Sequence, residues 1–372
     1  MTGESYPDTL LVGLAIEDYR YYFLRELREL MGAQLTIVSG NQHFASAYEM
    51  GQMMSALPQI VPAENSYVLD RRFVVQRGAN RKMLAADVLV FEFNPRFANL
   101  WPVLLARKAL GRPSIGWGHV YSRAGSESRT NKLRQMLRSL ATGSLLYTDG
   151  EQAEFERRYG SHPSWVAPNA LYSSDDLARL SQPQPDRENI VFVSRLVPEK
   201  RPEVGLHAAR AFKEQTGWTG KLLIAGEGPE EASLRKLSSE LGLDESVEWL
   251  GRLFGVEDLA DAYNTAFAAI NPGYVGLSIV QAGSFGVPLV YPADLPDHAP
   301  EIDLAQPGVN SYAASDASAS ALAAALIEAH ERHLADPAVA YARCQQSILT
   351  KHSAEGMASG FAAAVQAAAA PT

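Results

Sequence analysis

Short apolar runs alternate with helical segments along the chain, and this alternation is the feature that most constrains the fold. Residues 9–16 are apolar and β-prone, the segment YRYYFLRELREL that follows is helix-like, and residues 34–39 again favour a strand. Further strands are expected at 88–93, 113–117 and 144–148, with a helix at 100–110. Strands that alternate with helices form a parallel sheet covered on both faces. The pattern therefore predicts an α/β fold whose ligands bind beyond the carboxyl ends of the strands.

The second half of the chain repeats this pattern, with strands expected at 189–194, 221–225, 247–250 and 266–270. At 372 residues the chain is too long for one ordinary hydrophobic core. Residues 173–188 are polar and contain two prolines, which is typical of a linker. We therefore expect two doubly wound domains and a terminal helix, arranged as a domain at 1–172, a linker at 173–188, a domain at 189–352 and a helix at 353–372.

The composition favours small molecules over nucleic acid as partners. Asp and Glu number 42 against 33 Lys and Arg, which gives a net charge of −9. The one cysteine, Cys344, excludes an intrachain disulfide and a cysteine-based zinc site and fits a reducing compartment. The pattern of a signal peptide is missing, and no run approaches the roughly 20 apolar residues that span a bilayer. We therefore expect a cytoplasmic protein, soluble or attached to the inner face of the membrane.

The segment 271–301, NPGYVGLSIVQAGSFGVPLVYPADLPDHAPE, has the pattern of a ligand-binding turn. A buried strand is expected just before it, and a helix whose apolar face is interrupted by Gln281 is expected from Leu277 onward. The glycine-bearing turn between them, GYVG, aims backbone N–H groups and the positive end of a helix dipole at one point. Such a point favours an anion such as a diphosphate. A plain strand-to-helix connection would have the same glycines.

The loop after the strand at 189–194 contains two cations, Arg195 and Lys200. Both could neutralise a diphosphate, Arg through planar bidentate hydrogen bonds and Lys as a mobile point charge. The alternative is a charged surface loop in which Glu199 is their partner.

The next two strands are also followed by glycine loops. Gly226-Glu227-Gly228-Pro229 resembles half of a dinucleotide-binding fingerprint, but the third glycine is missing, which disfavours an oxidoreductase. The loop Gly251-Arg252 has a backbone that could read the edge of a base. Metal ligation and serine hydrolysis are not expected, because H-E-x-x-H and G-x-S-x-G are both missing. The acidic pair Asp294 and Asp297 is better explained as part of a simple loop.

Polar residues also follow the strands of the first half. Glu17 to Arg20 follow the first strand, Glu92 and Asn94 follow another, and His119 follows the strand at 113–117 in the segment WGHVYSR. A histidine there can donate or accept a hydrogen bond near pH 7. Each group has a structural alternative: a solvated helix start with a snorkelling Arg20, an Asn-Pro turn, and a structural histidine.

Residues 129–140, RTNKLRQMLRSL, have helical periodicity. The spacing places Leu133, Met136, Leu137 and Leu140 on one face, and Lys132, Arg134, Gln135 and Arg138 elsewhere. We expect a helix that faces the core and exposes a solvated basic face. The alternative is that this basic face contacts a membrane surface or an acidic acceptor.

The order of these features resembles one known family. R-L-V-P-E-K follows one strand, G-E-G-P the next and L-G-R a third, and NPGYVGLSIVQAGSFGVPLV is followed by H-A-P-E-I. This order resembles the retaining glycosyltransferases of family 4, whose two Rossmann-like domains face each other across a cleft in the GT-B arrangement. The resemblance covers about 189–310 and is loose over the first half, where DYRYYFLREL and WGHVYSR look like segments of bacterial polysaccharide and natural-product members.

The resemblance implies a nucleotide sugar in the second domain, an acceptor in the first, and a last helix that packs back on the first domain. On the nucleotide side, Arg195 and Lys200 match the diphosphate-binding pair and Gly226 and Gly228 the glycine turn. The other matching positions are the loop beside the base (Gly251, Arg252), the segment whose amides meet the donor sugar and phosphate (Val275, Gly276, Leu277, Ser278), and the histidine near the transferred sugar (His119).

The sequence departs from the family at one motif. Members commonly have two glutamates eight positions apart, and these positions are Gly273 and Gln281 in this chain. Gln281 can still hydrogen-bond ribose hydroxyls, but it has no charge. Glu301, or His298 near it, is the candidate replacement for the missing acids. The alternative is that both residues only shape a loop.

The resemblance therefore predicts a retaining, metal-independent transferase of a hexosyl or N-acetylhexosaminyl group. Its donor would be a nucleotide-diphosphate sugar, UDP-sugar above all, and it would need no prosthetic group. Its acceptor would be a hydroxyl of a sugar, a lipid-linked molecule or a small molecule. A sugar-nucleotide epimerase of the same fold and a noncatalytic nucleotide-sugar-binding protein stay open as alternatives.

Overall fold

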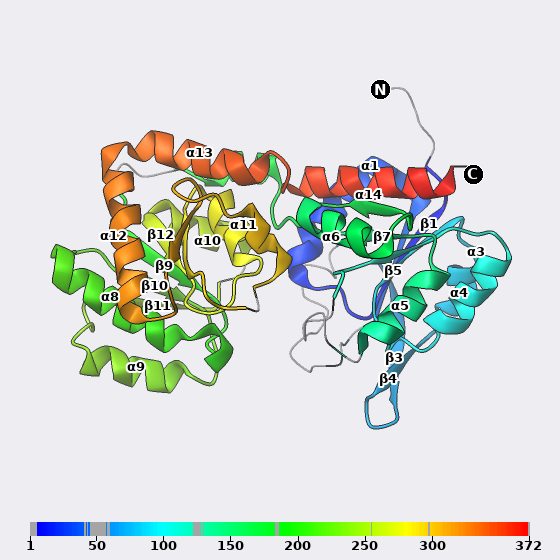
Figure 1. The fold of residues 1–372 in the computed structure, drawn as a ribbon, viewed down its shortest axis with the longest axis horizontal. Coiled ribbons are helices and arrows are strands. Elements are labelled where there is room, and N and C mark those ends of the chain that lie inside the picture. Colours follow the sequence, from blue (N-terminus) through cyan, green and yellow to red (C-terminus); the bar gives the residue numbers. More distant parts are fainter. Residues whose placement is uncertain are drawn as a thin grey trace. The chain divides into compact units, whose positions relative to one another are not determined.

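The chain divides into two α/β units, one formed by Met1–Leu171 with Ala354–Thr372 and the other by Tyr172–Ser353. The structure is a computed structural model, and it describes residues 6–40, 42, 44, 57, 60–121, 128, 130–182, 186–253, 255–296 and 298–370. Each unit is built around its own β-sheet (Figure 1). No helix in the described part of the chain is long and apolar enough to cross a membrane.

The first unit has an eight-stranded sheet in the order β4-β3-β2-β1-β5-β6-β7-β8. All neighbouring strands are parallel except β3 and β4, which form an antiparallel hairpin at one edge. The sequence did not predict this hairpin, whose first strand is mostly half-exposed. The strands are β1 Thr9–Gly13, β2 Leu35–Gly40, β3 Ile60–Val68, β4 Phe73–Arg77, β5 Val88–Glu92, β6 Ser114–Trp117, β7 Gly143–Leu146 and β8 Ser164–Val166.

Helices cover both faces of the first sheet. Successive residues of a strand point to opposite faces, and Leu10 and Leu11 of β1 accordingly belong to different cores. The core of Leu11 includes α1 and α14, and the core of Leu10 includes α3, α4 and α5. The helices are α1 Tyr21–Met31, α3 Asn80–Ala85, α4 Leu100–Ala109, α5 Thr130–Leu140, α6 Asp149–Tyr159 and α14 Ala354–Ala369, with short 3-10 helices η1 Asp18–Arg20 and η2 Gly32–Gln34.

The last helix, α14, lies along α1 in the first unit (Figure 1). The rings of Phe23 and Phe361 are 5.8 Å apart between these two helices. At Gly360 a Cβ atom would lie 2.4 Å from the carbonyl oxygen of Val166, so the helix approaches β8 closely. The chain therefore returns to its first unit after completing the second.

The second unit has a six-stranded, all-parallel sheet in the order β11-β10-β9-β12-β13-β14. Its first strand, β9, lies in the middle, so the strand order reverses direction between β9 and β12. In open α/β sheets such a switch point is where ligands bind. The strands are β9 Asn189–Val193, β10 Leu222–Ala225, β11 Val247–Gly251, β12 Ala266–Ile270, β13 Leu289–Pro292 and β14 Ser311–Ala314.

Helices also cover the second sheet. Ile190 and Phe192 of β9 pack in a core with α8 and α12, while the residue between them, Val191, is fully buried on the other face. The helices are α7 Ser174–Leu180, α8 Pro202–Thr216, α9 Glu231–Glu240, α10 Gly255–Asn264, α11 Ser278–Ser284, α12 Ala319–Ala335 and α13 Pro337–Leu349, with 3-10 helices η3 Pro198–Lys200 and η4 Pro300–Leu304.

Helix α7 occupies part of the segment 173–188, for which the sequence predicts a linker. The Asn264 side chain at the end of α10 donates to the carbonyl of Leu180, 2.9 Å away, and joins this helix to the second unit. The division between the units accordingly lies between Leu171 and Tyr172.

Candidate functional site

Three loops at the carboxyl ends of β9, β10 and β11 are hydrogen-bonded side by side. The backbone N–H of Leu196 donates to the carbonyl of Glu227 at 2.9 Å, and the N–H of Gly226 donates to the carbonyl of Gly251 at 2.7 Å. The sequence placed candidate residues in all three loops, and the structure brings the loops together at the carboxyl ends of the strands of the second sheet.

Two glycines allow this close approach. A Cβ atom at Gly226 would lie 1.8 Å from the carbonyl oxygen of Ser194, and one at Gly228 would lie 2.2 Å from that of Leu196. No side chain can occupy these positions unless the backbone moves. The glycines of the G-E-G-P segment, which follows β10, therefore let this segment pack closely against the loop that contains Arg195.

Asn271 organises the turn after β12. Its side-chain nitrogen donates to the carbonyl of Tyr274 at 3.1 Å and to the hydroxyl of Ser278 at 2.8 Å, and its oxygen accepts from the N–H of Gly273 at 3.3 Å. This buried side chain thus closes the turn and fixes the start of α11. The first N–H groups of a helix have no acceptor within the helix, so the turn presents donors at this edge.

The two predicted phosphate-binding cations differ in their surroundings. Arg195 is exposed, and its guanidinium makes no hydrogen bond or ion pair with any other residue that the structure describes. The Lys200 ammonium is half-buried, lies 3.6 Å from the centre of the Tyr274 ring and donates to the Tyr274 carbonyl at 3.4 Å. Lys200 therefore connects the loop after β9 to the turn after β12, across the switch point.

The structure gives a physical reason for the missing glutamate at Gly273. A Cβ atom there would lie 2.6 Å from the carbonyl oxygen of Glu199 and 2.9 Å from the Cα of Lys200. The backbone of η3 fills the space that a side chain would need. A glutamate cannot be accommodated at this position in the observed conformation.

Gln281, at the second motif position, is half-buried on α11. Its side-chain nitrogen donates to the hydroxyl of Tyr172 at 3.0 Å, and the Tyr172 ring packs on Phe285 with centroids 5.2 Å apart. The hydrogen bond holds the Gln281 amide against the Tyr172 hydroxyl. The sequence did not single out Tyr172, because its partner is 109 positions away.

His298 and Glu301 have different roles in the loop that follows β13. The Nδ1 of His298 accepts from the N–H of Val275 at 2.9 Å, and its Nε2 donates to the carbonyl of Pro292 at 2.8 Å. Both ring nitrogens are thus engaged, and the histidine ties the turn to the end of β13. Glu301 is only 2% exposed at the start of η4, which packs on α11. Asp297, which forms an acidic pair with Asp294 in the sequence, is outside the described residues.

In the first unit, His119 lies beyond β6 and is paired with a carboxylate. Its Nδ1 is 3.0 Å from Oε1 of Glu151, which is almost fully buried, while the imidazole is 41% exposed. Glu151 also accepts from the N–H groups of Val120 and Tyr147, each at 3.2 Å. A carboxylate acceptor places the proton of a neutral imidazole on Nδ1, so Nε2 is the basic nitrogen. Ser122 and Arg123, in the same sequence segment, are outside the described residues.

The sequence missed Glu151, although one signal was present. Thr148 and Glu151 have the spacing of a capping box at the start of α6, and the N–H of Glu151 does donate to the Thr148 hydroxyl at 3.0 Å. The Glu151 side chain, however, reaches His119 instead of closing the box. A residue of a local motif therefore makes a hydrogen bond to a distant residue, and no sequence spacing reveals that bond.

The prediction of a solvated basic face on α5 is wrong for its two arginines, while Lys132 and Gln135 are exposed. Arg134 and Arg138 point inward, whereas Leu133 and Met136 are 44% and 58% exposed. Arg134 donates to the carbonyls of Phe93 and His119 at 3.1 and 2.7 Å, and burial lowers the pKa of its guanidinium to about 10. Arg138 is 3% exposed and lies 4.5 Å from the centre of the Tyr159 ring. The two arginines take the interior positions because carbonyls and aromatic rings from other elements surround them.

The loops after β1 and β5 are also held by internal contacts. Arg20 is 6% exposed, donates to the Asn169 side chain at 2.6 Å and stacks over the ring of Trp117 at 4.9 Å, so it is not the solvated residue of a helix start. Glu92 accepts from the N–H of Leu14 at 2.9 Å. These residues shape the carboxyl edge of the first sheet.

Within the part of the chain that the structure describes, no three His, Cys, Asp or Glu side chains are grouped as metal ligands. Cys344 is fully buried, and burial raises the pKa of its thiol to about 12, so the thiol is protonated at neutral pH.

Comparison with protein families gives a match that falls on the second unit. Residues 175–343 match the family described as "Glycosyl transferases group 1". The second unit matches a group 1 glycosyltransferase domain. The match contains every residue of the second domain that the sequence assigned to the nucleotide and the donor sugar.

Two curated proteins are similar in sequence to part of this chain. A D-inositol 3-phosphate glycosyltransferase of Catenulispora acidiphila is 30% identical over 165 residues, which are 38% of this chain and 38% of that protein. An exopolysaccharide phosphotransferase of Streptomyces coelicolor is 35% identical over 108 residues, which are 28% of this chain and 11% of that protein. The chain thus spans well under two thirds of the length of these relatives.

Solved structures resemble both units together. Anabaena HepE in complex with UDP has a TM-score of 0.70 at 17% identity, with 96% of this chain and 99% of that chain covered. A glycosyltransferase of Rickettsia africae has a TM-score of 0.70 at 12% identity, with 98% and 100% covered. The lipopolysaccharide galactosyltransferase WaaB has a TM-score of 0.66 at 14% identity, with 96% and 99% covered. These similarities confirm the predicted GT-B fold class with two Rossmann-like domains.

Proposed function

We propose that the protein is a retaining glycosyltransferase of family 4 that moves a sugar from a nucleotide-diphosphate donor to an acceptor hydroxyl. The observation that carries the proposal is the meeting of the loop of Arg195 and Lys200 with the turn 273–278 at the switch point of the second sheet. A departing nucleotide diphosphate develops negative charge, and positioned cations and backbone N–H groups stabilise such charge. The group 1 match over the same segment supports this assignment.

Each part of the edge has a proposed role toward the donor. Arg195 and Lys200 bind the diphosphate, with the N–H groups at the start of α11 beside them. The loop of Gly251 and Arg252 faces the base, and Gln281, oriented by Tyr172, hydrogen-bonds the ribose. Because η3 leaves no room for a side chain at Gly273, buried Glu301 is the acid that we assign to the sugar hydroxyls.

UDP-sugar is the proposed donor, with a hexosyl or N-acetylhexosaminyl group transferred without a metal ion. Support comes from the fold of Anabaena HepE, which was solved with UDP and with UDP-glucose, and from Staphylococcus aureus TarM, which was solved with UDP. The two cations of the loop after β9 can offset the diphosphate charge that a metal would otherwise offset. Full activity in the presence of EDTA is the corresponding expectation.

The acceptor is proposed to bind the first unit, with His119 directed at the transferred sugar. The hydrogen bond between Nδ1 and Glu151 fixes the orientation of the ring. A sugar, a lipid-linked molecule or a small molecule can each supply the acceptor hydroxyl.

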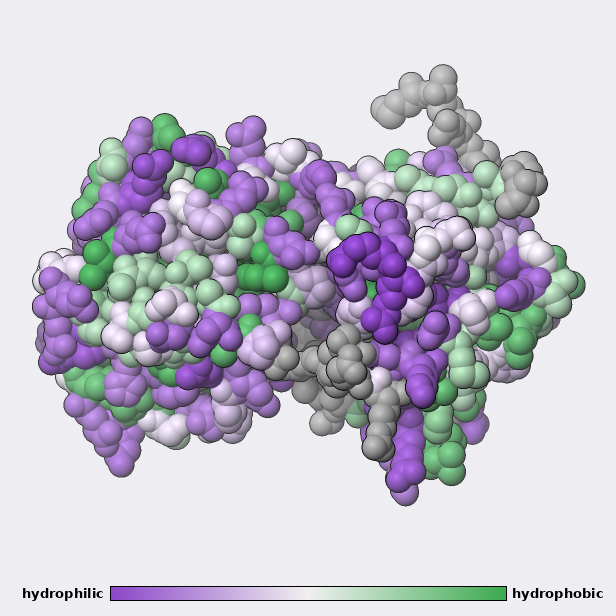
Figure 2. Space-filling model, in the orientation of Figure 1, coloured by the Kyte–Doolittle hydropathy of each residue, from purple (hydrophilic) through white to green (hydrophobic). Residues whose placement is uncertain are grey.

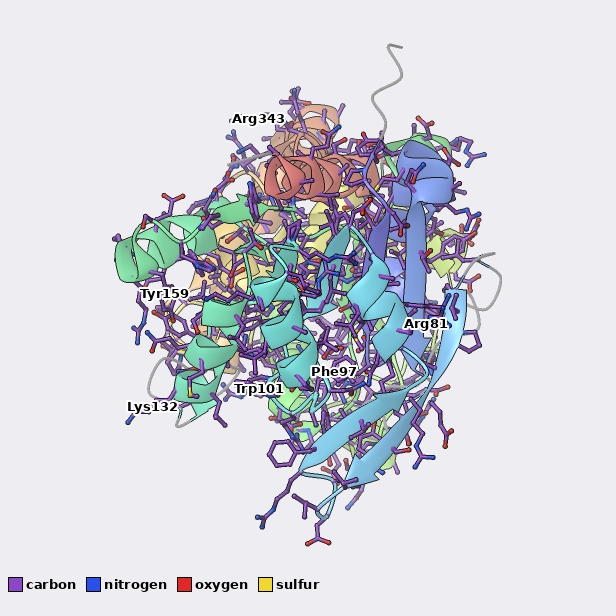
Figure 3. The ribbon with its side chains drawn as sticks, turned by 90° about the vertical axis from the view of Figure 1, so that its right-hand side faces the viewer. Arg81, Phe97, Trp101, Lys132, Tyr159 and Arg343 are labelled. Carbon is purple, nitrogen blue, oxygen red and sulfur yellow. The ribbon has the colours of Figure 1, made fainter. Side chains whose placement is uncertain are left out.

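A lipid-linked acceptor would bring the protein to a membrane surface. Hydrophobic side chains are exposed on the neighbouring helices α4 and α5: Leu105 on α4 is 56% exposed, Leu110 just after α4 is 66% exposed, and Leu133 and Met136 on α5 are also exposed. Green patches cover the α3–α4 side of the first unit in Figure 2, and Lys132 projects outward from α5 in Figure 3. We propose this surface, in place of the predicted basic face, as the part that would contact lipid.

The steric exclusion at Gly273 also favours a second candidate, a noncatalytic nucleotide-sugar-binding protein. One experiment separates the two. The protein is incubated with UDP-sugars and a panel of acceptors, nucleotide release is measured, and the anomeric configuration of any product is determined by NMR. Acceptor-dependent release with a retained configuration supports the transferase. Donor binding without release identifies a binding protein, and inversion removes the retaining mechanism.

A further inference from the structure

A cavity with a buried arginine lies at the opposite end of the second sheet, at the amino ends of its strands. The cavity has a volume of about 180 Å³ and is lined by Gly286, which precedes β13, by Gly308, which precedes β14, and by residues of α12 and α13. Loops that precede strands lie at the amino ends of those strands. The cavity is therefore separated by the length of the sheet from the donor site, which lies at the carboxyl ends.

Arg187 lines this cavity with a guanidinium that lacks acceptors. The residue is 4% exposed, and its Nε and Nη2 atoms have no hydrogen-bond partner among the described residues. Its carbon Cζ lies 4.8 Å from the centre of the Tyr341 ring, which covers the plane of the guanidinium but accepts no N–H hydrogen bond along its edge. Burial lowers the pKa of Arg187 to about 10, so it is charged at neutral pH.

Arg107 in the first unit shows how this chain can satisfy all the hydrogen bonds of a buried arginine that has a purely structural role. Arg107 is fully buried, and its N–H groups donate to Ser114 Oγ and to the carbonyls of Met83, Ala86, Asp87 and Pro113 at 2.6–3.0 Å. All five donors of that guanidinium are used. A buried cation without such acceptors is strongly unfavourable. Arg138 in the first unit also has two nitrogens without partners, and aromatic rings surround it. Arg187 lines a cavity in which an acceptor can lie, so its bare edge indicates an acceptor from outside the chain.

The other charged groups at the cavity favour an anion. Arg332 and Arg343 are exposed residues of α12 and α13 on its lining, and Arg343 is labelled in Figure 3. Burial, and then the charge of Arg187, lowers the pKa of His333 to about 4, so this lining residue is neutral. Asp336 is the one acidic residue among the described lining residues, and its carboxylate accepts from the N–H of Val339 at 3.2 Å as the cap of α13. Three cations thus face one carboxylate that already has a structural role.

We propose that this cavity binds a small phosphate-type oxyanion, either inorganic phosphate or the phosphate group of a small metabolite. The Nε and Nη2 donors lie along one edge of the planar guanidinium, and such a fork matches two oxygens of a phosphate. Arg332 and Arg343 supply further positive charge at the rim. The bound anion completes the hydrogen bonds of Arg187 and stabilises the second unit, independently of the donor site.

Thermal unfolding tests the proposal with inorganic phosphate as the probe and sodium chloride of the same ionic strength as the reference. A ligand that binds only the folded state raises the Tm, and we expect a saturable rise of about 3 °C or more. Glycerol 3-phosphate serves as a second probe. A larger response to it assigns the site to a phosphate monoester, and a response to phosphate alone assigns it to the free ion. No specific response to either probe overturns the proposal.

Variants test which residues produce the rise in Tm with phosphate. Arg187→Met removes the phosphate response and raises the Tm measured without phosphate, because it removes an uncompensated buried charge. Arg235→Met, at an exposed arginine paired with Glu231 on α9, keeps the response, and so does Lys200→Ala at the opposite edge. An unchanged response in Arg187→Met, or its loss in Lys200→Ala, contradicts the assignment. If Arg187→Met fails to fold, the double variant Arg332→Gln/Arg343→Gln must weaken the response for the proposal to stand.

Discussion

The carboxyl edges of the two sheets are built in different ways. In the second unit the edge consists mainly of backbone: glycine loops that touch one another, a turn closed by Asn271, and two cations on the loop after β9. In the first unit it consists of buried side chains, with Glu151 holding His119 and Arg20 enclosed by aromatic rings. A backbone-built edge suits the phosphates and sugar that many donors share. A side-chain network can vary with the acceptor without altering the sheet.

Removing either cation of the second unit should have the largest effect. Loss of one charge-stabilising donor typically costs ~3 kcal/mol, or about 100-fold in rate, so we expect Arg195→Ala and Lys200→Ala each to lower kcat/KM for transfer by about tenfold or more. Steady-state nucleotide release measures the effect, and Arg235→Ala on α9 of the same unit is the control. Near-normal rates in both variants would remove the phosphate-binding role of this loop.

A side chain at Gly273 should destabilise the second unit. Its Cβ would collide with the backbone of η3, and overpacking of this kind costs about 1–3 kcal/mol. We expect Gly273→Ala to lower the free energy of unfolding by that amount in urea titration, and Gly273→Glu to lower it further. Gly276→Ala is the matched control, because its Cβ would meet Ala299 and Tyr274 at the ordinary distances of 3.7 and 3.9 Å. Equal stability of Gly273→Ala and Gly276→Ala would show that η3 is not fixed against the turn.

Glu151→Gln tests the side-chain edge of the first unit. The amide keeps the size of the carboxylate, but it loses the charge that orients His119 and accepts from two N–H groups. Charge-assisted hydrogen bonds of this kind contribute about 1.5–3 kcal/mol, and we expect kcat to fall about tenfold with little change in the KM for the donor. Glu154→Gln, on the same helix, serves as the control. A raised donor KM with unchanged kcat would contradict a role confined to the acceptor side.

Membrane contact is the smallest expected effect. Replacing Met136 by Asp removes an exposed apolar side chain from α5 and adds a negative charge. If this surface contacts lipid, co-flotation with anionic vesicles should fall several-fold while activity on a soluble acceptor is unchanged. Equal flotation of Met136→Asp and the unmodified protein would exclude this surface.

The same difference between the edges explains what the sequence could predict. The alternation of apolar runs and helices depends on local periodicity, and the glycines at Gly226 and Gly228 mark places where backbones touch. Both kinds of signal are local, so they predicted the fold class and the loops that meet in the second unit. The edge hairpin β3–β4 was missed because its first strand is half-exposed and has no continuous apolar run.

The partners of buried polar side chains could not be predicted, because they are distant in the chain. Arg134 and Arg138 have helical spacing typical of a solvated face, yet carbonyls and rings from β5, α6 and their loops surround them. Asn169 lies 149 positions from Arg20, and Tyr172 lies 109 positions from Gln281. Periodicity cannot indicate which polar residue of a face will find such a partner.

The most direct test of the central claim is binding of UDP to the carboxyl edge of the second sheet, measured by isothermal titration calorimetry. The unmodified protein should bind UDP and a UDP-sugar in a 1:1 ratio, and the double variant Arg195→Ala/Lys200→Ala should bind UDP at least about tenfold more weakly with an unchanged Tm. Equal affinity in the double variant, or no binding of any nucleotide or nucleotide sugar by the unmodified protein, would contradict a donor site at this edge.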